Sequence, residues 1–118
     1  MKEVLTIIFI MCATFAYSQT ISEVRNELHR QGVPCVEIVL AQARLETGNF
    51  TSSLCRSHHN LFGIKHNGRY AHYANWKDSI TDYKKRISSR YNGGSYYAFL
   101  VRIKYASDPK YIAKLKQF

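Results

Sequence analysis

The 118-residue sequence has few acidic residues, few cysteines and no long apolar segment. It contains 8 Asp and Glu against 17 Lys and Arg, which gives a formal net charge of +9 at pH 7. It has 3 cysteines, and no pair drawn from Cys55, His58, His59, His66 and His72 has zinc-finger spacing. We therefore expect no metal and no other cofactor. Without repeats or a low-complexity linker, the chain has room for one domain only.

The longest apolar run, residues 4–16, follows Lys2 and is shorter than the roughly 20 residues that span a membrane. Small residues at Ala16 and Ser18 precede Gln19, an order that is typical of a secretory signal peptide. We expect residues 1–18 to be removed and residues 19–118 to be exported to the periplasm or beyond the cell, without stable membrane insertion. Cys35 and Cys55 remain after that cleavage, either as a disulfide or as buried thiols.

The excess of positive charge favours an anionic partner. Nucleic acid, anionic lipid and the acidic polymers of a bacterial envelope all carry the required charge. Export argues against nucleic acid, and no predicted helix is dense in Arg and Lys with base-reading side chains. An envelope polymer is therefore the expected partner.

The pattern of apolar residues predicts a mostly helical α+β domain with one small hairpin. Helices are predicted over residues 20–32, 34–47, 76–91, 95–105 and 109–115, with a short helical turn over 52–58. Asn67-Gly68 is a strong hairpin-turn signal between residues 60–65 and 69–73. The helix before Gly48 is apolar on nearly every side, so we expect it to be central and buried.

Glu46 lies in the last turn of that buried helix. The helix dipole and apolar surroundings both disfavour a charged carboxylate there, so we predict a raised pKa. A carboxyl group that stays protonated near neutral pH can serve as the general acid of a glycosidase. The alternative from spacing alone is a glutamate that faces solvent or pairs with Arg44 or Arg56.

Four segments resemble the glucosaminidase family of peptidoglycan hydrolases, glycoside hydrolase family 73, also described as mannosyl-glycoprotein endo-beta-N-acetylglucosaminidase-like domains. These are IVLAQARLETGNF at residues 38–50, NLFGIK at 60–65, DSITDY at 78–83 and YASDPKY at 105–111. The resemblance covers roughly residues 36–115, and the combination of LETG with NLFGIK is its most specific part.

The resemblance implies a lysozyme-like fold that cleaves peptidoglycan glycan strands as an endo-β-N-acetylglucosaminidase. It implies that Glu46 is the general acid and that Tyr105 faces the sugar beside it. It also implies a substrate-binding cleft lined by Asn60, Phe62 and Gly63, with an aromatic floor from Tyr70 and Tyr73. Aromatic rings suit this task because sugars present C–H faces that pack on them. We expect the protein to act as a monomer.

The sequence departs from the family because it lacks a second acidic residue in the predicted hairpin. Family members often carry an acidic residue in the β lobe, but residues 65–73 contain none. Asp78 is the nearest later acid, and its place in the first turn of a helix favours capping. We therefore expect a single-acid mechanism, assisted by the substrate's N-acetyl group or by a water held by Tyr73 or Tyr105. A lytic transglycosylase or N-acetylmuramidase on the same fold, and a non-catalytic wall-binding module, are the alternatives.

Overall fold

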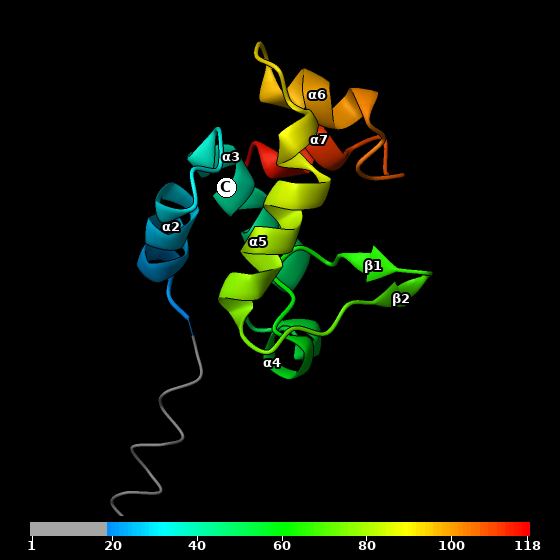
Figure 1. Ribbon diagram of the computed structural model, residues 1–118. Helices are drawn as coiled ribbons and strands as arrows, with labels where there is room; N and C mark the ends of the chain where they lie inside the picture. The colour runs from blue at the N-terminus through cyan, green and yellow to red at the C-terminus, as the bar shows by residue number, and fades with distance from the viewer. Residues whose placement is uncertain (1–18) are drawn as a thin grey trace, which may run out of the picture.

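The computed structural model describes residues 19–118, so the expected signal peptide lies outside the described residues. That part of the chain contains six α-helices, one 3-10 helix and one two-stranded sheet (Figure 1). The helices are α2 (Ile21–Arg30), α3 (Val36–Thr47), α4 (Ser53–His58), α5 (Trp76–Arg86), the 3-10 helix η2 (Ser88–Arg90), α6 (Tyr96–Arg102) and α7 (Tyr111–Leu115). The strands are β1 (Lys65–His66) and β2 (Arg69–Tyr70). The predicted α+β class is confirmed, and the arrangement is consistent with a lysozyme-like fold.

Side-chain caps open four of the six α-helices, near the starts that the sequence predicted. The Thr20 hydroxyl accepts a hydrogen bond from the Glu23 backbone N–H, and the Glu23 carboxylate accepts one from the Thr20 N–H, at 3.1 and 3.0 Å. This reciprocal capping box satisfies two backbone donors at the start of α2. Ser52, Asn75 and Ser95 cap α4, α5 and α6 with single side-chain bonds.

The helix predicted over residues 76–91 is shorter in the structure. α5 ends at Arg86, and the chain continues as the 3-10 turn η2. The hydroxyl groups of Ser88 and Ser89 donate to the carbonyl oxygens of Lys84 and Lys85. Serine hydroxyls that bond to the backbone four residues earlier disturb a helix, which accounts for the early end.

The last two helices are also shorter than predicted. α6 ends at Arg102 instead of residue 105, because Lys104 adopts a left-handed conformation with φ +56°. α7 begins at Tyr111, two residues after Pro109. Before it, the Asp108 carboxylate accepts a hydrogen bond from the Lys110 N–H at 2.9 Å, so this segment forms a turn that precedes the helix.

α3 is the central helix of the core, as predicted, and it packs against α2 and α7. Its Val39 and Ala43 are fully buried, and so is the polar side chain of Gln42. The Gln42 amide donates to the Tyr111 hydroxyl at 3.2 Å and accepts a hydrogen bond from the Tyr83 hydroxyl. Because both ends of the amide have partners, the core keeps a polar group without a large desolvation cost.

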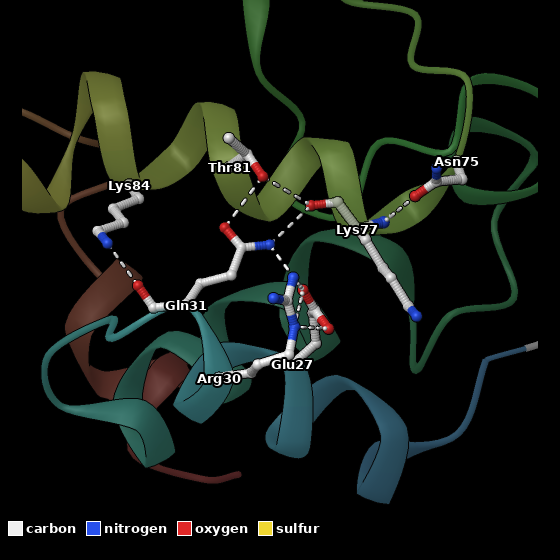
Figure 2. A network of polar contacts seen from close by, with 7 residues as sticks. All are labelled: Glu27, Arg30, Gln31, Asn75, Lys77, Thr81 and Lys84. Carbon is white, nitrogen blue, oxygen red and sulfur yellow. Dashed lines mark hydrogen bonds and ion pairs between the residues drawn. The ribbon is translucent and has the colours of Figure 1, made fainter.

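A polar network joins α2 to α5 (Figure 2). The Gln31 side chain lies between the two helices, donates to the Lys77 carbonyl and accepts from the Thr81 hydroxyl. It also donates to the Glu27 carboxylate at 2.9 Å, which Arg30 contacts as well. A single side chain thus ties the end of α2 to the solvent-facing turns of α5.

β1 and β2 form the predicted hairpin, with Lys65 opposite Tyr70 and His66 opposite Arg69. The strands are shorter than predicted. The turn residues Asn67 and Gly68 both have positive φ, as this two-residue turn requires. Figure 1 shows the hairpin projecting to one side of α5, with α2 on the other side.

Cys35 and Cys55 are free thiols in the structure, so the disulfide alternative is not the one observed. Cys35 is exposed, with its sulfur 3.9 Å from the Tyr91 hydroxyl, whereas Cys55 is buried and accepts a hydrogen bond from the Gln19 amide.

No helix within residues 19–118 has the length and apolar character needed to cross a membrane.

We predict that Thr20→Ala lowers the free energy of unfolding by about 1 kcal/mol, because it removes the hydroxyl of the capping box. Urea denaturation of the parent and the variant measures this change. Ser22→Ala is the control, since Ser22 is exposed in the same turn. Equal stability of the two variants would show that the capping box contributes nothing.

Candidate active site

A cleft of about 740 Å³ opens where the end of α3 meets the loop before β1 and the loop after α6. Figure 1 shows the loop after α6 and the hairpin on the same side of α5. The cleft is lined by Glu46, Phe62, Gly63, Ile64, Lys65, Arg86, Ile87, Arg90, Ile103, Lys104, Tyr105, Ala106, Ser107, Asp108 and Tyr111. Glu46, Phe62, Gly63 and Tyr105 are therefore brought together in one site, although they come from three separate segments.

Glu46 lies at a tightly constrained helix end. The three residues Gly48, Asn49 and Phe50 all have positive φ, between +55° and +68°. The Thr47 hydroxyl donates to the Ala43 carbonyl at 2.6 Å and accepts from the Phe50 N–H at 2.9 Å. This turn ends α3 directly after Glu46, so the backbone that carries the carboxyl group is held in place.

Burial raises the pKa of the Glu46 carboxyl group, and the hydroxyl of Tyr111 opposes part of that rise. None of the ion pairs found in the described part of the chain includes Glu46. Arg44, one alternative partner, donates instead to the Asn49 side chain at 2.8 Å. Glu46 therefore has the half-buried, unpaired environment that a proton donor needs.

The backbone of Gly63 closes over the Glu46 carboxyl group. A methyl group at Gly63 would lie 3.5 Å from Oε2 of Glu46 and 3.9 Å from the Tyr70 ring. Gly63 also has φ +66°, a conformation that glycine adopts at little cost. Gly63, a predicted site residue, thus lies beside the acid, whereas Tyr70, which is 50% exposed, lies near Gly63 and is not among the residues that line the cleft.

Asn60 lies beneath this loop and is fully buried. Its amide nitrogen donates to the carbonyl oxygens of Ile64 and Ala71, at 2.9 and 3.1 Å. Its side-chain oxygen accepts from the N–H groups of Phe62 and Ile64. The side chain has no surface left for a sugar, so the structure gives it the task of shaping the loop around Gly63.

The two remaining tyrosines differ in position. The Tyr105 hydroxyl donates to the Phe62 carbonyl at 3.3 Å, and burial raises the pKa of Tyr105 well above its usual range. Tyr105 therefore stays neutral in the cleft. Tyr73 does not line the cleft; its hydroxyl donates to the Asp82 carboxylate at 2.6 Å. The Asp82 contact ties the hairpin segment to α5.

The cleft contains an acid that the sequence analysis did not consider as part of the site. Asp108 lines it, and its carboxylate accepts hydrogen bonds from the Lys114 ammonium and the Lys110 N–H at 2.7 and 2.9 Å. The hydrogen bond from Lys114 lowers the pKa of Asp108 the most, and the bond from the Lys110 N–H lowers it further. Asp78 is exposed and does not line the cleft, and the cap of α5 is Asn75.

The site combines a half-buried carboxyl group with a raised pKa and a cleft between a helical part and a small hairpin, an environment that favours the protonated form of a carboxylic acid. Comparison with protein-family models matches residues 21–118 to Glucosaminidase, described as mannosyl-glycoprotein endo-beta-N-acetylglucosaminidase. The chain therefore belongs to the glucosaminidase family, as the resemblance predicted, and its substrate class is a glycan. Comparisons with curated proteins and with solved structures gave no match.

We predict that Gly63→Ala and Gly68→Ala each lower the free energy of unfolding by about 1 kcal/mol, since both sites require positive φ. Only Gly63→Ala places a methyl group against Glu46, whereas the same group at Gly68 meets nothing within 4 Å. The Gly63 variant should therefore raise the pKa of Glu46 further, by shielding it from water. NMR titration of the carboxyl carbon measures the pKa; an equal shift in both variants would contradict this geometry.

We also predict a pH-dependent difference in stability between the parent and Glu46→Gln. Because the pKa of Glu46 is raised in the folded state, that state binds more protons above the unfolded pKa of about 4.3, so the stability contributed by protonated Glu46 is lost as pH rises. The parent should lose stability relative to Glu46→Gln from pH 4 upward. Chemical denaturation at several pH values tests this, and a constant difference would mean that Glu46 is not desolvated.

Proposed function

We propose that the protein hydrolyses the glycan strand of peptidoglycan as an endo-β-N-acetylglucosaminidase, with Glu46 as the general acid. The observation that carries this proposal is the position of Glu46: a carboxyl group with a raised pKa, at the end of a buried helix, facing an open cleft. The family match supports a glycosidase in general and a glycan substrate.

Protonated Glu46 donates its proton to the glycosidic oxygen as the bond from that oxygen to the sugar C1 breaks. The raised pKa favours the protonated form that this step requires. In the second half of the reaction, the Glu46 carboxylate takes a proton from the water that attacks C1. The same group thus acts first as acid and then as base, and it ends the cycle protonated.

The electron-deficient C1 needs a second partner while the leaving group departs. We propose that the carbonyl oxygen of the substrate's own N-acetyl group attacks C1 as the leaving group departs, and that the incoming water then breaks this C1–O bond and restores the N-acetyl group, as occurs in substrate-assisted glycosidases. Asp108 is the other carboxylate in the cleft, but Lys114 and the Lys110 N–H already engage it. Its position therefore favours a role in holding the loop before α7.

Tyr105 supplies the surface on which a sugar ring packs, whereas Phe62 is only 3% exposed and packs its ring against Tyr83. Both line the cleft, and the hydrogen bond between Tyr105 and the Phe62 carbonyl holds the two segments together. Tyr70, which is half exposed, extends this surface beyond the cleft lining. We also propose that the protein acts outside the cytoplasm after loss of residues 1–18, where its substrate lies.

We predict that Glu46→Gln lowers the release of soluble muropeptides from purified peptidoglycan by about 100-fold or more, because the amide cannot donate the proton. Asp78→Asn should leave most of the activity, since Asp78 lies outside the cleft lining. Asp108→Asn should retain measurable turnover. Mass spectrometry of the digest provides the readout, and an Asp78 or Asp108 variant as inactive as Glu46→Gln would exclude the single-acid mechanism.

The same digests distinguish the competing functions. A reducing N-acetylglucosamine end supports the proposal, a reducing N-acetylmuramic acid end indicates a muramidase, and an anhydro sugar indicates a transglycosylase. Binding to the wall without any released fragment would establish a non-catalytic module. The first-formed anomer, followed by NMR, reports the assisting group: retention supports the N-acetyl group, whereas inversion supports a held water.

A further inference from the structure

Four cationic side chains line the cleft that holds Glu46: Lys65, Arg86, Arg90 and Lys104. Two of them already have partners within the protein. The Arg86 guanidinium donates to the Asp82 carboxylate at 2.8 Å, and the Lys65 ammonium lies 4.9 Å from the centre of the Tyr70 ring. Arg90 and Lys104 are exposed, and no ion pair found within residues 19–118 includes either of them.

Lys104 occupies a position where lysine is a poor choice for the backbone. The Tyr105 N–H donates to the Leu100 carbonyl, and the Lys104 N–H donates to the Val101 carbonyl, each at 3.0 Å. These two bonds form a Schellman motif that ends α6, in which the left-handed residue is usually glycine. Lys104 has φ +56°, so the chain keeps a charged side chain where glycine would be more stable.

Arg90 reaches the same cleft from a different element. It is the last residue of η2, and its N–H donates to the Ile87 carbonyl at 3.0 Å. The chain after it is held by the Tyr91 hydroxyl, which donates to the Gly94 carbonyl. The short α5 and the turn that follows it therefore place this guanidinium at the cleft instead of on the side of a longer helix.

We propose that Arg90 and Lys104 bind a carboxylate group carried by the glycan, next to the glycosidic bond whose oxygen Glu46 protonates. This inference rests on the proposed function and makes the protein selective for acidic over neutral hexosamine chains. A carboxylate suits this pair because guanidinium and ammonium groups without internal partners form charge-assisted hydrogen bonds with it. Two sources supply such a group: the lactyl ether of the sugar itself, or an acidic peptide attached to it.

The experiment measures binding in the Glu46→Gln background, so that no substrate is consumed and the result does not depend on turnover. The probes are three glycans of equal length: a neutral N-acetylglucosamine oligomer, a muramic-acid-containing oligomer with free lactyl carboxylates, and the same oligomer with its peptides attached. Isothermal titration calorimetry gives the Kd of each. Arg90→Gln and Lys104→Gly should each weaken binding of a carboxylated glycan, and the double variant should weaken it by about tenfold.

Three features make the outcome decisive. Lys104→Gly removes the charge and relieves the left-handed strain, so its Tm should equal or exceed that of the parent while its affinity falls. Lys85→Gln, an exposed cation on α5 outside the cleft lining, gives the same change in net charge and should leave the Kd unchanged. The carboxylated probe that loses affinity identifies the source of the carboxylate.

The proposal is overturned if the Arg90 and Lys104 variants bind all three glycans as the parent does. It is also overturned if Lys85→Gln weakens binding equally, because the effect would then be one of overall charge. Failure of the glycosidase proposal would look different: the parent would release no muropeptides, whatever the affinities of these variants.

Discussion

The arrangement of the site depends on how the buried amide of Asn60 holds the loop before β1. Its four hydrogen bonds reach the backbone of Phe62, Ile64 and Ala71, so one side chain holds both the approach to the hairpin and the return from it. The loop then has a single conformation in which Gly63 lies against Glu46. The surroundings of Glu46 are therefore set by a residue that is itself fully buried.

On the helical side of the cleft, a buried polar side chain likewise supports the site. Gln42, one turn before Glu46 on α3, joins the hydroxyl groups of Tyr83 and Tyr111 inside the core. Tyr111 in turn lies close enough to Glu46 to affect its pKa. Glu46 thus rests on a buried polar network, while desolvation from the surrounding core raises its pKa.

Local signals predicted most of the fold because they act over a few residues. Thr20, Ser52, Asn75 and Ser95 cap helices close to the predicted helix starts, and Asn67-Gly68 makes the hairpin turn. Helix ends were predicted less well. α5 stops early because serine hydroxyls bond back to its last turn, and α6 stops at a left-handed lysine that carries no sequence signature.

The candidate site was predictable only in part. Glu46 and the NLFG segment carry motif signals, so their place in one cleft follows from sequence. The cations of η2 and of the loop after α6 do not, since they converge through tertiary packing across long stretches of chain. For Asn60 and Tyr73 the resemblance implied contact with the sugar. In the structure Asn60 is fully buried and supports the loop, and the Tyr73 hydroxyl donates to Asp82.

The buried tyrosines also limit the alkaline range in which the fold persists. Burial raises the pKa of Tyr96 to about 12 and that of Tyr83 further still. An unfolded chain releases such phenolic protons near pH 10, at about the usual tyrosine pKa, whereas the folded core retains them. As the pH rises above about 10, the free energy of unfolding therefore falls. The desolvation that raises the pKa of Glu46 also keeps these phenols protonated, and strong base should unfold the chain before the core tyrosines ionise.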